Sequence, residues 1–266
     1  MSVPIFERDG TRFIATSMAR GPWDPGHCHG GAPASLLAAI LDATPAPTPM
    51  QVLRLTFDLA RPVPVGTPLD VDVRVVREGR RVQLLDADLT AGDGTSLVHV
   101  RALRVRTGHE DVPPSSCEDD APPSPAPLDL PRFTPAEGWA TEGFWSAVDV
   151  RFVAGDLGTP GPGTAWFRVA TTLAEGVEVT PVARVAAAAD FGNGIGSPLP
   201  IDRYLYINPD LTISLHRLPT TEWVAITAGS VAQPQGVGLT TTTLYDERGR
   251  IGQATQSLFV AALAAR

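Results

Sequence analysis

The stretch "LTFDLARP", residues 55–62, occurs a second time in altered form as "LTISLHRLP", residues 211–219. A turn follows each copy at a similar distance, "AGDGTS" at 91–96 and "DERGRI" at 246–251. The corresponding residues are Leu55, Thr56, Leu59 and Arg61 in the first copy and Leu211, Thr212, Leu215 and Arg217 in the second. Two strands rich in Leu and Thr can align by chance, but the shared order of elements around them favours an internal repeat.

Each copy of the repeat contains one predicted helix. In "APASLLAAILDA", residues 32–43, Pro33 stands just inside the start and an apolar stripe follows, which predicts a helix of about three turns. The stripe consists of Leu36, Leu37, Ile40 and Leu41. In the second copy, "TPVARVAAAADFGNG", residues 180–194, again places a Pro just inside the start of a helix.

Alternating apolar and polar residues around these helices predict strands. The expected strands are 53–59, 69–75, 81–91 and 96–106 in the first copy, and 203–217, 222–232, 237–246 and 251–262 in the second. Before the helices, "TRFIATSMA" at 11–19 and "VDVRFV" with "GTAWFRVATTL" predict further strands. A sheet with one apolar face curls around the single helix that covers it, so each copy is expected to be an α+β unit, and the two units can pair sheet to sheet.

The segment between the copies has a different composition. Residues 108–136 are dense in Pro, Ser and acids and almost empty of large apolar side chains, as expected of a linker. The predicted organisation is therefore an N-terminal unit at 1–107, a linker at 108–136 and a C-terminal unit at 137–266.

The overall composition narrows the class of protein. A net charge of −8 and a pI near 5.1 repel phosphate backbones, so nucleic acid is not an expected partner. There is no signal-peptide pattern, and no apolar run approaches the roughly 18 residues of a membrane span, which predicts a cytoplasmic protein. Cys28 and Cys117 form no recognisable disulfide framework, so both are expected to be reduced.

Asp190 is the most unusual polar residue of the second predicted helix. It lies at the edge of a face built from Val182, Ala186 and Ala189, so its carboxylate should be shielded from solvent. Burial is expected to raise its pKa, which would suit a general base near neutral pH. The alternative is an Asp that caps the end of the helix.

Two amides accompany this carboxylate. Asn193 follows Asp190 on the same helical face, so it either holds the carboxylate or contacts substrate, or else it caps the helix. Gln256, in the last predicted strand, shares a face with Ala254 and Leu258 and needs a partner there, whereas Gln253 lies on the opposite face.

The stretch "GHCHGG", residues 26–31, contains groups typical of a metal or reactive site. Its two histidines and one cysteine are adjacent and have no partner cluster elsewhere in the sequence, which argues against zinc. A Cys28 nucleophile lacks an acyl-transfer motif. The favoured interpretation is that His29, Gly30 and Gly31 bind substrate, with free N–H groups at the helix start forming an oxyanion hole. The alternative is a tight turn in which His29 packs locally.

Four segments carry a resemblance to a known family. They are "GPWDPGHCHGGAPASLLA", "AAAADFGNGI", "YINPDLTISLHRLPTTEW" and "YDERGRIGQATQSLF". Together and in this order they resemble the double hotdog acyl-CoA thioesterases related to acyl-CoA thioesterase II, over about 11–107 and 138–262. The resemblance implies a double hotdog fold, in which each sheet wraps around a central helix, and a role in lipid metabolism.

The resemblance also implies a set of catalytic residues. In the family, water attacks the thioester while held by an Asp, a Gln and a Thr or Ser. Asp190 matches the Asp and Gln256 the Gln, but Asn208 stands where relatives carry the hydroxyl, and an amide can also orient water.

The sequence therefore predicts an acyl-CoA thioesterase that uses water directly, with neither covalent intermediate nor cofactor. A non-catalytic acyl or small-ligand binding protein is the alternative, and a hydratase or dehydratase built on His29 or His216 is a further rival. Arg61 and Arg217 have two explanations, a structural ion pair or contact with the phosphates of coenzyme A. Acyl chain length stays open, and so does assembly into a homo-oligomer.

Overall fold

The computed structural model describes residues 3–108, 112–113, 115, 121–134, 142–157 and 159–263. Part of the expected linker at 108–136 lies outside the described residues, and so does Cys117. The boundaries between the two units therefore stay a prediction.

The N-terminal half contains two short strands, one long helix and four longer strands. The elements are β1 (Phe6–Asp9), β2 (Arg12–Ala15), the 3-10 helix η1 (Ser17–Ala19), α1 (Gly31–Ala43), β3 (Met50–Asp58), β4 (Pro68–Arg77), β5 (Val82–Ala91) and β6 (Ser96–Arg106). The predicted strand at 11–19 is thus shorter than expected, because Thr16 caps the turn of η1 by accepting a hydrogen bond from the N–H of Met18.

The C-terminal half repeats this plan with four additional short elements. Its elements are the 3-10 helix η2 (Pro127–Asp129), α2 (Phe144–Ala147), β7 (Val148–Ala154), β8 (Gly163–Val169), α3 (Pro181–Ala189), α4 (Gly192–Ile195), β9 (Tyr204–Ile207), β10 (Asp210–Leu215), β11 (Val224–Gln233), β12 (Val237–Asp246) and β13 (Gly249–Ala262). The short η2, α2, α4 and β9 have no counterpart at the same place in the first half.

All of these strands join one sheet whose order reads the same from either end. The order is β1-β2-β4-β5-β6-β3-β10-β13-β12-β11-β8-β7, with β9 attached to β13. Counting inward from the two edges of the sheet shows which strands occupy equivalent positions. They are β1 and β7, β2 and β8, β4 and β11, β5 and β12, β6 and β13, and β3 and β10. The halves therefore pair edge to edge in one sheet, rather than sheet to sheet as expected.

The repeated sequence stretch forms the seam between the halves. Strands β3 and β10 run antiparallel, and Thr56 lies opposite Thr212. These two residues also correspond in the repeat, so a local twofold axis passes between them. Leu55 pairs with Ile213 and Phe57 with Leu211, all of them buried. The apolar residues of the repeat thus build the centre of the core.

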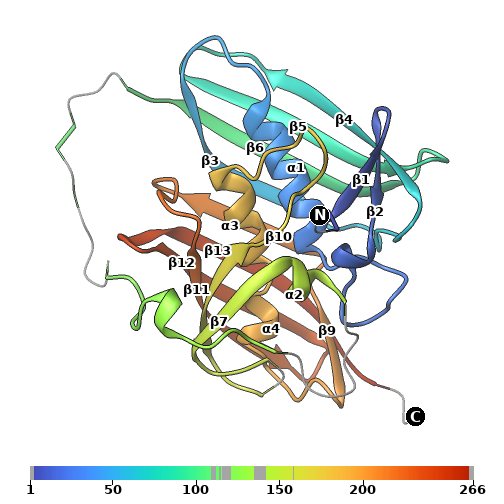
Figure 1. The fold of residues 1–266 in the computed structure, drawn as a ribbon, viewed down its shortest axis with the longest axis vertical. Coiled ribbons are helices and arrows are strands. Elements are labelled where there is room, and N and C mark those ends of the chain that lie inside the picture. Colours follow the sequence, from blue (N-terminus) through green and yellow to red (C-terminus); the bar gives the residue numbers. More distant parts are fainter. Residues whose placement is uncertain are drawn as a thin grey trace.

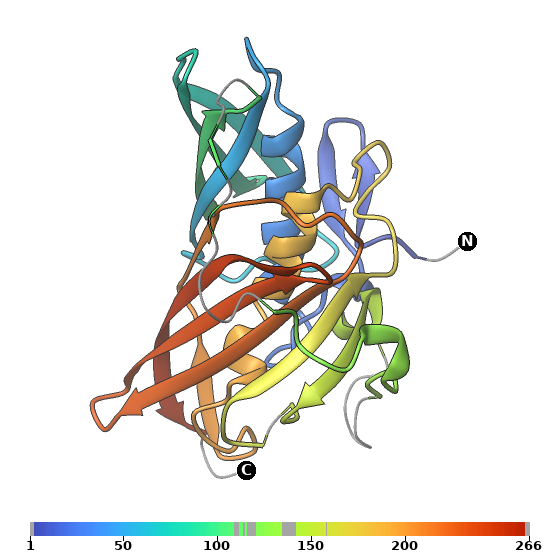
Figure 2. The ribbon, with the colours of Figure 1, turned by 90° about the vertical axis from the view of Figure 1, so that its left-hand side faces the viewer.

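The sheet of each half curls around a helix. Figure 1 shows α1 and α3 lying together along the middle of the molecule, and Figure 2 shows the strands wrapped around them. Residues 31–39 of α1 are all buried, as are Val182, Ala183 and the run from Val185 to Ala189 in α3. Because the side chains of α3 are mostly methyl groups, the two helices can approach closely. The predicted α+β class is confirmed.

Two predicted elements are interrupted, and both interruptions lie at the candidate site. The helix predicted at 180–194 divides into α3 and α4, because the backbone N–H of Phe191 bonds to Ala188 and that of Gly194 to Phe191, a tighter turn than the α-helix. The strand predicted at 203–217 divides into β9 and β10 at Asn208 and Pro209. Among the described residues, no helix is both long and apolar enough to cross a membrane.

Candidate active site

A cavity of about 570 Å³ lies where the start of α1 meets the end of α3. The N-terminal half contributes the loop at 21–30, Pro33 and the segment 59–63. The C-terminal half contributes Asp190 and Phe191, and the wall formed by 205–209. The predicted site residues His29, Gly30, Asp190, Asn193 and Asn208 all line this cavity.

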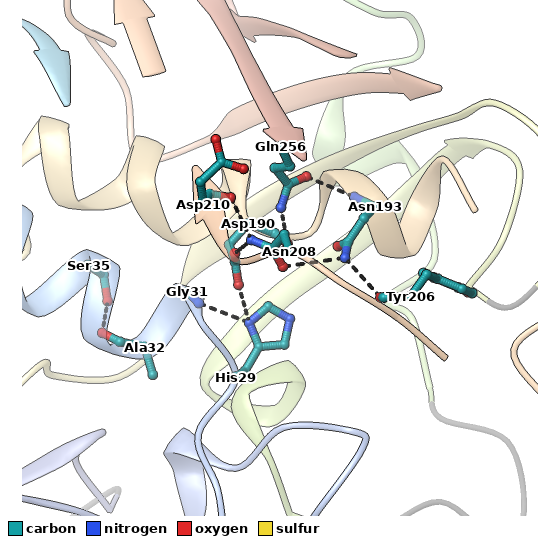
Figure 3. Close-up of polar contacts among 10 residues, drawn as sticks. All are labelled: His29, Gly31, Ala32, Ser35, Asp190, Asn193, Tyr206, Asn208, Asp210 and Gln256. Atoms are coloured by element: carbon teal, nitrogen blue, oxygen red, sulfur yellow. Dashed lines mark hydrogen bonds and ion pairs between the residues drawn. The ribbon is translucent and has the colours of Figure 1, made fainter. Parts of the chain in front are cut away.

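Asp190 ends α3 and is held by groups from both halves (Figure 3). Its Oδ1 accepts a hydrogen bond from Asn208 Nδ2 at 2.9 Å. Its Oδ2 lies 2.9 Å from Nδ1 of His29, and the side chains of Asp190 and His29 are only 3% and 12% exposed. The carboxylate expected from sequence therefore lies in a shielded position, in contact with a histidine from the other half.

The contacts of Nδ1 are the basis for assigning the proton of His29 to one of its two ring nitrogens. Nδ1 lies 2.9 Å from Asp190 Oδ2 and 3.1 Å from the backbone nitrogen of Gly31. It can either donate a hydrogen bond to the carboxylate or accept one from the N–H of Gly31, but it cannot do both. An ionised carboxylate requires a donor, so we assign the proton to Nδ1 on the basis of this network. The other nitrogen, Nε2, points away from Asp190 (Figure 3) and retains a lone pair in the neutral ring.

The pKa of Asp190 shifts in the direction opposite to the one expected. Burial raises it, but the hydrogen bond and charge of His29, the amide of Asn208 and the N–H of Gly31 together lower it below its ordinary value. The expectation of a carboxylate that titrates near neutral pH is therefore wrong. Asp190 stays ionised, and because a low pKa makes it a weak base, it is better suited to orienting His29 than to taking a proton itself.

The amides of Asn208 and Asn193 extend this network. Asn208 stands at the break between β9 and β10, and its Nδ2 also contacts the carbonyl of Asp210 at 3.2 Å. Asn193 Nδ2 donates to the carbonyl of Tyr206 at 3.3 Å and to Asn208 Oδ1 at 3.4 Å. Asn193 thus holds Asn208, which in turn holds Asp190. It lies within α4 and does not cap the helix.

Gln256 supports the site from behind. Its side chain is fully buried and does not line the cavity. Its Oε1 accepts from the backbone N–H of Asn193 at 3.1 Å, and its Nε2 contacts the carbonyl of Asp190 at 3.4 Å. Gly192 permits this contact, because a Cβ there would lie 2.7 Å from Gln256 Oε1. Gln256 therefore fixes the turn between α3 and α4.

The start of α1 supplies one backbone N–H group that has no hydrogen-bond partner among the described residues. The N–H of Ala32 bonds to the carbonyl of His29, and that of Gly31 faces the contact between His29 and Asp190. The N–H of Gly30 has no hydrogen-bond partner among the described residues. A Cβ on Gly30 would lie 2.8 Å from Asp190 Oδ2, so only glycine lets the carboxylate approach this closely.

Three rings packed together fix the orientation of His29. Its ring centroid lies 5.1 Å from that of Phe144 and 4.5 Å from that of Phe191. Sequence reasoning did not connect either phenylalanine with His29, because nothing in "GFWSA" or "DFGNG" marks them as neighbours of a residue in the other half. Their proximity is a consequence of the fold.

The reactive alternatives for "GHCHGG" find no support in the site geometry. Burial raises the pKa of Cys28 to about 12, so its thiol is protonated and a poor nucleophile. No group of three or more His, Cys, Asp or Glu side chains is arranged to hold a metal ion in the part of the chain that the structure describes.

The first half carries an equivalent of Asp190 in a different environment. Aligning Pro33 of α1 with Pro181 of α3 places Asp42 opposite Asp190. The same alignment places Val177, Glu178 and Val179 opposite His29, Gly30 and Gly31. Burial raises the pKa of Asp42, with Thr180 and Arg104 only partly opposing it, whereas the pKa of Asp190 is lowered. Only one of the two equivalent positions therefore has the histidine.

Comparisons with known proteins agree with this architecture. Residues 19–107 match the model of the acyl-CoA thioesterase N-terminal domain, and residues 118–260 match that of the acyl-CoA thioesterase C-terminal domain. No curated protein matches the chain.

Solved structures from three organisms resemble the whole chain. A thioesterase candidate from Novosphingobium aromaticivorans is 23% identical, with 97% of this chain and 99% of that chain covered and a TM-score of 0.72. An acyl-CoA thioesterase II, TesB2, from Mycobacterium marinum is 18% identical, with 97% and 96% covered and a TM-score of 0.66. A protein from Alicyclobacillus acidocaldarius with a hot dog fold is 18% identical, with 98% and 96% covered and a TM-score of 0.67. The predicted double hotdog fold is confirmed.

Proposed function

Because the chain belongs to the acyl-CoA thioesterase family, we propose that it hydrolyses acyl-CoA thioesters at the cavity between its two halves. The observation that carries this proposal is the contact between Asp190 and His29 in a cavity that is also lined by Gly30, whose N–H has no hydrogen-bond partner among the described residues. A carboxylate, a histidine and an N–H group are what acyl transfer to water requires.

In the proposed reaction each group has one role. Asp190 holds the proton of His29 on Nδ1, which leaves the Nε2 lone pair free to take a proton from a water molecule. The water oxygen forms a bond to the thioester carbonyl carbon, and the N–H of Gly30 stabilises the developing oxyanion. The carbon–sulfur bond then breaks, and the thiolate of coenzyme A takes the proton back from Nε2. Asn208, Asn193 and Gln256 position Asp190.

Arg61 supports coenzyme A as the carrier of the acyl group. It is exposed and is the one arginine that lines the cavity within the described part of the chain, and the sequence contains no lysine. Its repeat counterpart Arg217 is fixed by Asp246, with both nitrogen–oxygen distances at 2.6 Å. The side chain of Arg61 forms no ion pair or hydrogen bond among the described residues, and only the charge of Asp93 acts on it, so it can contact a phosphate of a ligand in the cavity.

The proposed activity is tested by following release of free thiol from a series of acyl-CoA substrates of increasing chain length. We expect saturable hydrolysis with kcat/KM on the order of 10⁴ M⁻¹s⁻¹ or more for the preferred chain. Crotonyl-CoA belongs in the series, because the histidine–aspartate pair would also suit a hydratase, and hydration would remove the enoyl absorbance without releasing thiol. Binding of acyl-CoA with no turnover of any substrate would instead indicate a binding protein.

The role of Arg61 is tested by the variant Arg61→Gln. Loss of one charged contact to phosphate should raise KM for the preferred acyl-CoA about tenfold and leave kcat within about twofold. The KM for the matching acyl-pantetheine, which has no phosphate, should not change. Arg80, which is exposed and lies outside the cavity, provides the control variant Arg80→Gln. An equal KM increase for both substrates would contradict the phosphate contact.

A further inference from the structure

A second cavity lies on the outer face of the sheet. It has a volume of about 450 Å³, and none of the residues that line it also lines the catalytic cavity. We call it the outer pocket. Strands β10 and β13 form its floor, with Ser214 paired with Gln253 and Leu215 with Gly252. Ser214 alternates along β10 with the buried Ile213 and Leu215, so its side chain faces away from the core.

The polar side chains that line the outer pocket can all donate hydrogen bonds, and none of them is acidic. They are Ser115, Ser214, His216, Arg250 and Gln253. None of these side chains makes a hydrogen bond or an ion pair within the part of the chain that the structure describes. The sequence has 29 acidic residues against 21 basic ones, yet Arg250 has no carboxylate partner there. The outer pocket thus presents unused donors and an uncompensated positive charge.

A second guanidinium group adjoins the outer pocket. Arg54 of β3 pairs with Ser214 across the seam, and its Nε is buried without a hydrogen-bond partner among the described residues. Paired residues of neighbouring strands have Cβ atoms about 5 Å apart, so Arg54 acts on the same region. Salt screens charges that lie more than about 10 Å away. An anion in the outer pocket is therefore attracted by these arginines more strongly than it is repelled by the net charge of −8.

The internal repeat relates the outer pocket to the catalytic cavity. Leu215 and His216 correspond to Leu59 and Ala60, which line the catalytic cavity beside Arg61. The counterpart of Arg61 is held by its ion pair with a fully buried carboxylate and does not line the outer pocket. The positive charge of the outer pocket therefore comes from residues that have no arginine counterpart in the repeat. His216, a candidate for hydratase chemistry on sequence grounds, lies here and not in the catalytic cavity.

We propose that the outer pocket binds the phosphate group of a small organic phosphate. A guanidinium group can hold two phosphate oxygens at once, and the hydroxyl, amide and ring N–H donors are then available to the third. A carboxylate has only two oxygens and would leave these donors unused. The volume lies within the range of small-molecule sites, about 300 to 1,000 Å³, and exceeds the needs of inorganic phosphate alone. Binding here does not depend on the chemistry of the catalytic cavity.

Isothermal titration calorimetry of the full chain at low salt tests this proposal, with AMP, adenosine and inorganic phosphate as the probes. We expect AMP to bind with a Kd of about 0.1 to 1 mM, inorganic phosphate to bind more weakly, and adenosine not to bind measurably. Raising the NaCl concentration to about 1 M should weaken the binding of AMP, because salt screens the attraction. Equal affinities for AMP and inorganic phosphate would overturn the assignment to an organic phosphate.

Two arginines of the same turn give a matched pair of variants. Arg250→Gln should raise the Kd for AMP about tenfold, because a charged contact with the phosphate is lost. Arg248 is exposed and lies outside the outer pocket, so Arg248→Gln removes the same charge and should leave the Kd within about twofold. Arg61→Gln should also leave it unchanged, which separates this site from the coenzyme A contact proposed for the catalytic cavity.

Circular dichroism spectra of the three variants should match that of the wild type, since each changed side chain is at least partly exposed. Absence of binding by both AMP and inorganic phosphate, up to about 10 mM, would overturn the proposal. Equal weakening in Arg250→Gln and Arg248→Gln would also overturn it, because only long-range attraction would then be at work. Loss of AMP binding in Arg61→Gln alone would place the phosphate in the catalytic cavity and not in the outer pocket.

Discussion

Asp190→Asn should lower kcat/KM for thioester hydrolysis by about 10³ to 10⁴, the loss expected when a carboxylate that orients a catalytic histidine becomes an amide. The asparagine oxygen can still accept from Asn208, but its NH₂ group would face Nδ1 of His29. An NH₂ group donates, so Nδ1 must then accept and the ring proton moves to Nε2. The lone pair required to activate water is lost.

Asp42→Asn is the control for this variant, because Asp42 occupies the equivalent position on α1 but has no histidine beside it. Its activity should stay within about twofold of wild type. Circular dichroism and thermal unfolding should show that both variants are folded. If Asp190→Asn kept more than a tenth of the wild-type kcat/KM, the assigned role of the carboxylate would be wrong.

Asp246→Ala should cause the largest loss of stability, about 3 kcal/mol, because it removes one partner of a buried ion pair. Asp246 is fully buried. Its carboxylate accepts hydrogen bonds from Nη1 and Nη2 of Arg217 and from the backbone N–H groups of Thr220 and Arg248. Its removal leaves Nη1 of Arg217 and the two backbone N–H groups without this acceptor, whereas Nη2 of Arg217 keeps the carbonyl of Gly249. The midpoint of thermal unfolding should fall by about 6 to 12 °C.

Asp93→Ala tests whether the loss comes from the ion pair or from the turn. Asp93 lies in the equivalent turn between β5 and β6, is exposed, and accepts only a local bond from the N–H of Thr95 at 2.9 Å. This variant should lose no more than about 0.5 kcal/mol. Equal losses in the two variants would show that the turn, and not the ion pair, determines the effect.

Acid should weaken the same ion pair. Burial opposes ionisation of Asp246, but Arg217 and the backbone N–H groups outweigh it and lower the pKa to about 2 from 3.8. A lowered pKa means that the stabilisation is complete above pH 3.8 and is lost as the pH falls through about 2. Urea unfolding of wild-type protein between these values should show a loss on the order of 2 kcal/mol from this group, absent in Asp246→Ala.

Periodicity and repetition in the sequence predict most of the fold. The long strands of both halves lie within a few residues of their predicted ranges, and the repeat identifies Thr56 and Thr212, which face each other in the seam. One apolar face per strand and one helix per copy suffice for this result. The sequence of a strand does not show which other strand will lie beside it in the sheet. The edge-to-edge pairing of the two halves was therefore not predicted.

The candidate site is predicted less completely, because its contacts join distant segments. Sequence reasoning found Asp190 and His29 separately, but their contact depends on the seam between β3 and β10. The direction of the Asp190 pKa shift depends on the same contact, so burial alone predicted the wrong sign. Alternation placed Gln256 inward without distinguishing a cavity from the packed turn behind it.

The seam between β3 and β10 has a consequence for how this protein could specialise. In a dimer of identical hotdog subunits, every substitution is made twice, so a residue that improves one site is also imposed on its twin. Here the subunits are fused, and either copy can change alone. In the proposed mechanism only one of the two equivalent sites has a histidine beside its carboxylate, an asymmetry that an assembly of identical subunits cannot have.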